Sequence, residues 1–320
     1  MAIALGSNAL LRGKFNTGSY GAQPTGNWQN LFFRSGTFGA SQNMVSDPVL
    51  GTGRRVVRPS RGFVDVQNSL VVPLDARAVG FWLKGLLGAP VTTGTGPYTH
   101  TFAGGDVTLP DLALEVGHPD LSPAQYFVLL GYIVNQLTIN MQTSDAPAAM
   151  NVDLLGQAEV AASGTSDAGT PASYTYTPFS AFKGSISREG SPLANITAAT
   201  FGVNNNATGV RVIQDSAITG GVDLGVPAYS GSLTARFTDT VLLADAQGGG
   251  AVELEFAYTN SASESLTFTY AQVDLPQQPR TINGPGGIEA SYNWQGSDVS
   301  AAGDGLSVVL VNDVASYASV

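Results

Sequence analysis

Residues able to carry acid–base, metal or nucleophile chemistry are scarce in this chain. It contains two histidines, His100 and His118, and no cysteine. Neither histidine has a carboxylate or a second histidine at the spacing of a metal site, so we interpret both as polar residues, His100 in a loop and His118 after a strand. The three lysines, Lys14, Lys84 and Lys183, do not follow a phosphate-loop pattern, and no G-x-S-x-G motif is present. The sequence therefore predicts no catalytic residue, no cofactor and no metal, and indicates that the protein is not an enzyme.

The densest cluster of charged groups is basic. Arg54, Arg55, Arg58 and Arg61 lie within eight residues, in a long stretch, 40–61, that contains Gly and Pro. Loops of this length inside a compact domain are usually functional. One interpretation is a solvated basic loop, and a second is a projecting arm whose arginines contact acidic surface on another subunit. Nucleic-acid binding comes third, because no aromatic platform accompanies the cluster.

Composition excludes several classes of protein. Only 12% of the residues are charged, against roughly 25% in a typical domain, while 43% are hydrophobic and 39 are Gly. The net charge of −10 argues against a protein that grips nucleic acid through its phosphates, and the scarcity of Glu and Lys argues against coiled coils. The apolar N-terminus precedes its basic residues, the reverse of a secretory signal, and no apolar run is long enough to cross a membrane. We expect a β-rich protein without membrane contact, made in the cytoplasm.

The two halves of the sequence share a pattern. Thr37–Gly39 returns as Thr200–Gly202, and Ser69–Leu70 returns as Ser232–Leu233, in each case 163 residues later. Both tripeptides run on into polar turn residues, and both Ser-Leu pairs lie in alternating segments. Internal repeats of this kind decide how a fold is divided, so they are weighed before its elements. The ordered agreement favours a duplicated domain.

Further along the chain the distance between matching residues falls to 140. Leu114–Val116 then matches Leu254–Phe256, and a single 23-residue insertion at 89–111 of the first half explains the change. Glu115 and Glu255 occupy matching places in this alignment. Each follows an apolar strand residue, so we interpret both as solvent-facing instead of an acid–base pair.

Hydrophobic periodicity predicts the elements of both halves. The expected strands are Leu31–Phe38, Val64–Val72, Leu112–Val116, Tyr126–Met141 and Met150–Leu155, then Phe182–Arg188, Ile196–Phe201, Val210–Ile213, Ser232–Phe237, Val252–Tyr258, Leu266–Val273 and Ile288–Trp294. One helix is expected in each half, over Asp75–Gly88 and over Thr238–Gly248. Asp75 suits the N-cap of the first helix, and Gly88 suits its left-handed stop.

The predicted fold is therefore mainly β, with two tandem antiparallel domains, each carrying one flanking α-helix. The expected division is residues 1–160 with the long loop 40–61 and the inserted loop 89–111, a linker over 161–178, and a second, duplicated domain over 179–320. Ser, Gly, Thr and Ala dominate the linker, and nothing in it is periodic.

Five segments of the first half carry a family resemblance. They are Gly18–Gln29, Asp47–Arg54, Val71–Lys84, Pro97–Phe102 and Pro110–Glu115. They resemble the tail tube proteins, or major tail proteins, of long-tailed bacteriophages, and the similarity covers about residues 18–157. These motifs are structural, so they identify a scaffold and no active site.

The resemblance implies β-sandwich or small-barrel domains, in rings that stack into a tube whose inner β-barrel lets DNA pass without specific binding. It implies a loop that reaches the next ring, which makes Arg54, Arg55, Arg58 and Arg61 candidates for inter-subunit or inter-ring contact. Rings in the family are commonly six-fold, so two domains per chain predict a trimeric ring of pseudo-six-fold symmetry. We also expect neutral or acidic residues on the lumen.

The implied partners are further copies of the chain, the tape measure protein, and the tail terminator or distal tail proteins. The implied location is the phage tail, after assembly in the bacterial cytoplasm. An alternative function is a carbohydrate-binding or surface-layer β-protein, which needs an aromatic cluster on one exposed face. Trp28, Trp82 and Trp294 are dispersed in the sequence. A hydrolase on a β scaffold is the weakest reading, because it lacks a triad, a metal cluster and an acid pair.

Overall fold

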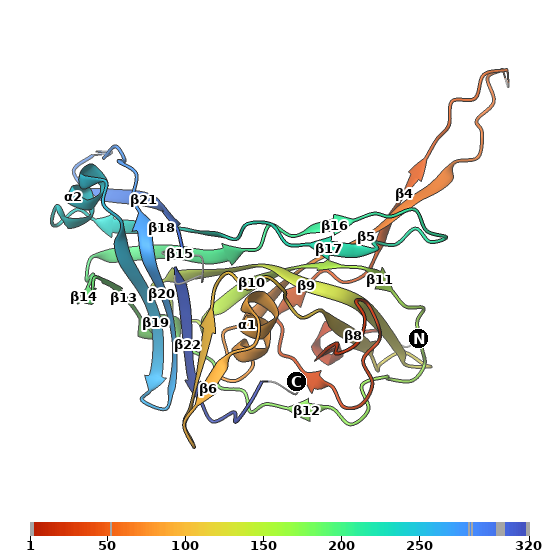
Figure 1. Ribbon diagram of the computed structural model, residues 1–320, viewed down its shortest axis with the longest axis horizontal. Helices are drawn as coiled ribbons and strands as arrows, with labels where there is room; N and C mark the ends of the chain where they lie inside the picture. The colour runs from red at the N-terminus through yellow and green to blue at the C-terminus, as the bar shows by residue number, and fades with distance from the viewer. Residues whose placement is uncertain (1–2, 52, 281, 283, 299–304, 318–320) are drawn as a thin grey trace.

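The protein is mainly β, as the sequence predicted. The computed structural model describes residues 3–51, 53–280, 282, 284–298 and 305–317 (Figure 1). The strands are β1 (Leu10–Phe15), β2 (Gln29–Asn30), β3 (Ser35–Gly36), β4 (Ser41–Val45), β5 (Ser60–Pro73), β6 (Val91–Thr93), β7 (Tyr98–Ala103), β8 (Leu112–His118), β9 (Gln125–Gln142), β10 (Ala149–Gly156), β11 (Ala158–Glu159), β12 (Ala172–Ser173), β13 (Gly184–Arg188), β14 (Ser191–Pro192), β15 (Ile196–Asn204), β16 (Thr208–Val210), β17 (Gly221–Asp223), β18 (Ala228–Arg236), β19 (Val252–Ser261), β20 (Glu264–Asp274), β21 (Glu289–Gly296) and β22 (Leu306–Asn312). The helices are α1 (Val79–Leu87) and α2 (Val241–Gly248), with 3-10 turns at Gly6–Asn8 and Ala181–Lys183. The long ladders are antiparallel, and the short ladder of β2 with β12 is parallel.

Six strands form the centre of the largest sheet, in the order β5, β10, β9, β15, β18, β21. Their side chains alternate between the two faces, as the period of an extended strand requires. On β10, Met150, Val152 and Leu154 are buried, while Asn151 and Asp153 are partly exposed. The same alternation on all six strands gives the sheet one apolar face and one polar face.

Strand β9 takes part in two sheets. Its first part pairs with β8, and its last part pairs with β10 on one side and β15 on the other. Gly131 lies between the two parts with φ +66, a conformation that residues with a Cβ rarely adopt. A Cβ at this position would also lie 2.8 Å from the Cβ of Gln157. The ladder of β9 with β8 shifts register at this point, since Leu112 lies opposite Tyr132 and Leu114 lies opposite Leu129.

The first helix is short and wholly buried. The side-chain oxygen Oδ1 of Asp75 accepts hydrogen bonds from the backbone N–H groups of Arg77 and Ala78 at 3.0 and 2.8 Å. Asp75 thus holds the turn that precedes the helix, and regular helix begins only at Val79. Gly88 ends it at φ +92 and ψ −173, so the positive φ was predicted correctly but the left-handed helical stop was not.

The second half follows the first in the order and pairing of its elements. In the first half, β10 pairs with β5 and β9, β9 pairs with β8, and β8 pairs with β1. In the second half, β21 pairs with β18 and β20, β20 pairs with β19, and β19 pairs with β13. A helix follows β5 in one half and β18 in the other. The α2 helix buries only Leu242 and Ala246, because less chain covers it.

Several sequence expectations about local structure were wrong. Of the predicted strand Val210–Ile213, only Val210 lies in a strand, at the end of β16. The segment 89–111 is no simple loop, since it contains the hairpin β6–β7, and β7 pairs along its length with β22 near the C-terminus. The segment Leu31–Phe38 is strand only at β3, because only Ser35 and Gly36 form ladder pairs with β5. Strands β1, β7 and β22 were not predicted.

The segment 161–178 is packed against the first half. Ala168 is fully buried, and its carbonyl accepts a hydrogen bond from the backbone N–H of Trp28 at 3.1 Å. Ala172 donates its backbone N–H to the carbonyl of Trp28 at 2.8 Å. These main-chain bonds satisfy polar groups that a free linker would leave to water.

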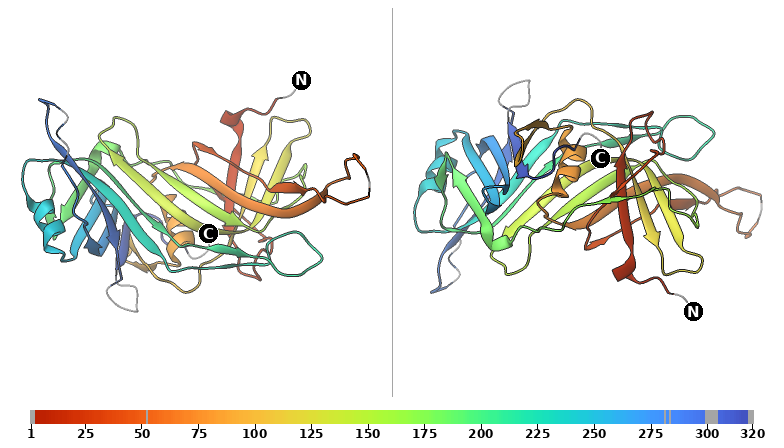
Figure 2. Two further views of the ribbon diagram at one scale, coloured as in Figure 1. Left: turned by 90° about the horizontal axis from the view of Figure 1, so that it is seen from above. Right: turned by 90° about the horizontal axis from the view of Figure 1, so that it is seen from below.

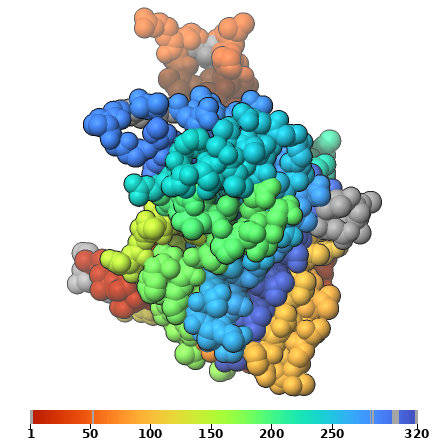
Figure 3. All heavy atoms as spheres, turned by 90° about the vertical axis from the view of Figure 1, so that its left-hand side faces the viewer, coloured from red at the N-terminus to blue at the C-terminus, as the bar shows by residue number. Residues whose placement is uncertain are grey.

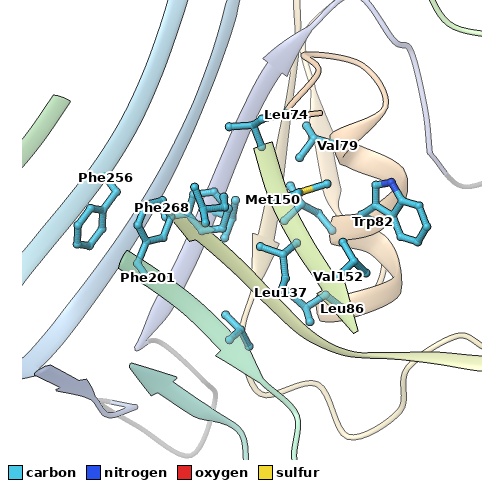
Figure 4. Packing of buried hydrophobic residues seen from close by; sticks show 14 of the residues in the cluster. Leu74, Val79, Trp82, Leu86, Leu137, Met150, Val152, Phe201, Phe256 and Phe268 are labelled. Carbon is cyan, nitrogen blue, oxygen red and sulfur yellow. The ribbon is translucent and has the colours of Figure 1, made fainter. Parts of the chain in front are cut away.

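One apolar core runs through both halves (Figure 4). Figure 4 shows Trp82 and Leu86 of α1 beside Val152 of β10, with Phe201 and Phe256 of the second half continuing the same cluster. The rings of Phe201 and Phe256 stack with centroids 4.3 Å apart. Aromatic pairs of this kind add about 0.5–1.5 kcal/mol to the free energy of burial. The two halves therefore share one core.

The C-terminal segment of the second half forms hydrogen bonds to helix α1 of the first half and to the turn before it. The hydroxyl of Tyr317 donates to the carbonyl of Arg77 at 2.6 Å and accepts from the amide of Asn312 at 2.7 Å. The ammonium of Lys84 donates to the carbonyl of Tyr317 at 2.7 Å, and burial lowers the pKa of this lysine to about 8.

We expect Tyr317→Phe to lower the free energy of unfolding by about 1–3 kcal/mol, because it leaves a buried carbonyl and a buried amide without their partner. Tyr176→Phe is the matched control, since Tyr176 is 47% exposed; its effect should stay within about 0.5 kcal/mol. Denaturant unfolding followed by circular dichroism measures both. Equal losses for the two variants would contradict this account of the C-terminal segment.

Candidate functional surfaces

The first candidate surface is the polar face of the six-stranded sheet. Its residues alternate with the buried ones and are small or polar for the most part. They are Asp65, Gln67, Ser69, Val71, Gln136, Thr138, Asn140, Asn151, Asp153, Leu155, Ala198, Thr200, Gly202, Asn204, Ser230, Ser232, Thr234, Glu289, Ser291, Asn293 and Gln295, with Arg236 at one end. We call this set the open face.

Charge on the open face is sparse and mostly negative. Its acidic residues are Asp65, Asp153 and Glu289, and its one arginine, Arg236, lies opposite Glu289 in the ladder of β18 with β21. The remaining side chains are neutral. Such a surface offers no row of cations to hold a polyanion.

Hydrogen bonds across the strands hold the polar side chains of the open face in place. The hydroxyl of Thr200 donates to the side-chain oxygen of Asn140 at 3.0 Å, across the ladder of β15 with β9. Asn204 donates to Gln136 at 3.3 Å on the same ladder. Two hollows of about 500 and 680 Å³ lie on this face, one in each half. Neither hollow contains a histidine, lysine or arginine among its lining residues.

The second candidate surface is an arm that projects from the body, at the upper right of Figure 1. Its stem is the two-stranded ladder of β4 with the start of β5, in which Val45 lies opposite Ser60. The predicted contact residues Arg54, Arg55, Arg58 and Arg61 all lie on the arm and are exposed. None of the four forms an ion pair with another residue that the structure describes.

The arm also exposes apolar side chains, which the sequence analysis did not single out. Leu50 and Val56 are 94% and 97% exposed, and Met44 and Phe63 on the stem are 65% and 45% exposed. Exposed apolar groups gathered on one projection mark an interaction site more often than scattered ones do. The arm is therefore both basic and apolar.

A second hairpin, β16–β17, braces the stem of the arm. The guanidinium of Arg211 pairs with Asp65 at 2.5 Å and lies 4.6 Å from the ring centre of Phe63. The backbone N–H of Val64 donates to the carbonyl of Ala217 at 2.9 Å. Figure 1 shows this hairpin running beside β5 toward the arm. The stem is thus held on two sides.

The prediction that Glu115 faces solvent was wrong. Glu115 is fully buried, and its carboxylate pairs with Arg12 of β1 at 2.8 Å. It also accepts hydrogen bonds from the hydroxyl of Ser166 and the backbone N–H of Asp167, both at 2.7 Å. The reason is that β1 and the packed segment 161–178 cover a strand that the sequence pattern left with one open face.

His100 was also placed wrongly in a loop. It lies in β7, fully buried, within 2.8 Å of the Thr92 hydroxyl and 2.9 Å of the Val314 carbonyl. Burial lowers the pKa of His100, so the ring is neutral at pH 7. Among the described residues, no group of three or more His, Asp or Glu side chains could hold a metal ion.

The tryptophans bear on the carbohydrate-binding alternative. Trp28, Trp82 and Trp294 are each 1% exposed. A sugar-binding face stacks exposed aromatic rings on its ligand, so these three side chains offer no such platform. No observation favours that alternative.

A family model described as phage tail tube protein matches residues 6–296. No curated protein matches the chain significantly. None of the helices that the structure describes is long and apolar enough to span a membrane.

The buried carboxylate can be tested against its counterpart in the second half. We expect Glu115→Gln to lower the free energy of unfolding by about 3 kcal/mol, because it leaves the guanidinium of Arg12 without its counter-charge. Glu255→Gln is the control: Glu255 is partly exposed and accepts from the Ser187 hydroxyl at 3.4 Å. Its effect should stay below about 1 kcal/mol. Urea unfolding of both variants measures the difference, and a Glu255 loss as large as the Glu115 loss would refute it.

Proposed function

Since the chain belongs to the phage tail tube protein family, structural proteins of the virion tail, we propose that it assembles into stacked rings that form the tube for phage DNA. The observation that carries this proposal is the six-stranded sheet with one apolar face and one polar face of low charge. Joined edge to edge, such sheets make a wall whose apolar face is covered by each subunit's own core. The open face then lines the lumen.

The chemistry of the open face supports passage of DNA without binding. Most of its side chains are neutral, and its two neighbouring arginines face carboxylates: Arg211 pairs with Asp65, and Arg236 lies opposite Glu289. Affinity for a duplex comes mainly from Lys and Arg contacts, so this face has few groups that attract phosphates. A weakly negative wall repels the duplex modestly and keeps it mobile. We therefore assign the open face to the lumen.

We further propose that the two halves are copies of one domain, over 1–160 and 179–320, joined by 161–178. The registers of their ladders support this. Leu70 lies opposite Val152 on β5 and β10, and Leu233 lies opposite Tyr292 on β18 and β21. These are the positions expected from shifts of 163 and 140 residues. A chain with two such domains supplies two of six positions, so three chains complete a ring.

The arm is proposed to contact a neighbouring ring or the seam between subunits. Arg54, Arg55, Arg58 and Arg61 meet a protein whose net charge is −10, and Leu50 and Val56 lose their exposure in the contact. Opposite charges guide the approach and set the register, while apolar burial supplies the affinity. Other tail proteins, the tape measure and the terminator or distal proteins, are proposed partners inside and at the ends of the tube.

Reversing the four arginines to Glu tests the arm. We expect the variant to stay folded, because the four side chains are exposed, and to form at least tenfold fewer tubes, which corresponds to about 1.4 kcal/mol of assembly free energy. Negative-stain microscopy counts the tubes, and circular dichroism checks the fold. Lys183→Glu is the control, an exposed cation outside the arm. Normal tube formation by the reversed variant would remove the arm from the assembly.

The ring itself tests the duplication. We expect purified protein to form rings or tubes with an open lumen, and cryo-electron microscopy to resolve three chains per ring in six similar positions. Six chains per ring would refute the trimer, and a uniform population of monomers under all assembly conditions would refute the tube function.

A further inference from the structure

Two ladders join the halves of the chain by main-chain pairing, β7 with β22 and β9 with β15, and the second of these lies at the centre of the six-stranded sheet. Strand β15 pairs with the last part of β9 from Ala198 opposite Gln142 to Asn204 opposite Gln136. This ladder turns two smaller sheets into one. In the order of the sheet, β9 ends the first set of strands and β15 begins the second.

In the first half, β3 lies next to β5 in the way that β15 lies next to β18 in the second half. The ladder pairs Ser35 with Val71 and Gly36 with Leu70. Adding 163 to each residue gives Ala198 opposite Thr234 and Ala199 opposite Leu233, which are pairs of β15 with β18. The residues that match β15 are therefore 33–41. Among the described strands, β3 pairs with β5 alone, so its other edge faces no strand.

In the second half, the residues that follow β20 correspond to the last part of β9 in the first half. Met150 lies opposite Ile139 on β10 and β9. Adding 140 to each gives Ala290 opposite Pro279, which continues the ladder of β21 with β20 beyond its last pair, Gln295 with Asp274. The residues that match the end of β9 thus begin at Pro276. The described residues 275–280 belong to no strand.

These two open edges lie at opposite ends of the sheet. The order is β3, β5, β10, β9, β15, β18, β21, β20. Figure 2 shows the same separation from above, with β5 in orange and β21 in blue on different sides of the molecule. Figure 3 looks onto the second half, where blue chain stands out beside α2 at the surface. One chain cannot join these edges to each other.

We propose that the segment 276–280 of one copy pairs with residues 37–41 of a second copy, in the register that β9 and β15 use within the chain. The inference rests on the proposed ring. Within the chain, Thr200 of β15 lies opposite Asn140 of β9. Subtracting 163 from the number of Thr200 and adding 140 to the number of Asn140 places Thr37 of one copy opposite Arg280 of the other. The same shifts place Gly39 opposite Gln278. The occupant of the open edge is thus a second copy of this chain, and its contact is a replica of a contact already inside the molecule.

Physical features of both edges fit this pairing. Thr37 and Gln277 are exposed. The backbone N–H of Ala40 donates to the carboxylate of Glu159 in its own chain at 2.7 Å, and pairing exchanges this bond for one to the second copy. Pro276 and Pro279 have no N–H to donate, so in this segment Gln277, Gln278 and Arg280 supply the N–H donors and the prolines contribute carbonyl groups alone. The same two prolines limit pairing of the free segment with unrelated edges. Because donor and acceptor edges differ, each copy binds the next head to tail, the arrangement that generates rings.

Engineered cysteines test the register, since the natural chain has none. The test variant is Thr37→Cys with Arg280→Cys, in assembled tubes under mild oxidation. The internal template, Asn140→Cys with Thr200→Cys, is the positive control, and should form a disulfide within one chain. The register control is Thr37→Cys with Gln277→Cys, which displaces one sulfur by about 10 Å along the strand, beyond the reach of a disulfide.

We expect the test variant to give covalently joined chains on a non-reducing gel, on the order of tenfold more than the register control. The joined species should end at the number of chains in one ring. Tubes that form normally but crosslink no better than the register control would overturn the pairing and leave the tube function standing. A wild-type chain that forms no ring would overturn the proposed function, and the pairing with it.

Discussion

The ladder between β9 and β15 is the interaction on which the rest of the molecule depends. A strand edge presents unpaired N–H and C=O groups, and leaving them buried without partners is costly. This ladder satisfies one edge from each half with a single set of main-chain bonds. Leu137, Ile139 and Phe201 lie on its buried face, so the ladder brings side chains of both halves into the shared core.

The low proportion of charged residues follows from the different roles of the two faces of this sheet. One face must be apolar because it covers the core, and the other is filled with short polar side chains that bond across strands, as Thr200 does with Asn140. Few positions remain where a long charged side chain is useful. Among the charges that persist, four arginines lie on the arm, and others form ion pairs such as Arg12 with Glu115, Arg77 with Asp313 and Arg211 with Asp65. The low proportion of charged residues is thus explained by the architecture of the sheet.

Alternation and turn residues were enough to predict the mainly β class, the two helices and most of the long strands, because those features depend on residues close in sequence. Glu115 and His100 were misplaced because their environments come from far away: Arg12 lies 103 residues from Glu115, and Asn312 lies 212 residues from His100. A signal for Glu115 did exist. Apart from Glu115 itself, its strand β8 carries no polar side chain between Leu112 and Gly117, which is typical of a strand buried on both faces. The exposure of the four arginines followed from sequence, but the apolar residues beside them were not recognised, since exposure of Leu50 is a tertiary property.

The proposed head-to-tail pairing also bears on ring closure. A contact between unlike edges makes a ring only if the rotation at each junction divides a full turn, and otherwise it makes a filament. The ladder of β9 with β15 fixes one rotation by its register and by the twist of its strands. If the junction between chains repeats that register, every junction around the ring turns by a similar angle, and the curvature of the wall is set within each folded chain. The bulge of β9 opposite Asp153 and Leu154 then becomes a determinant of ring size, because it changes the local twist beside the junction.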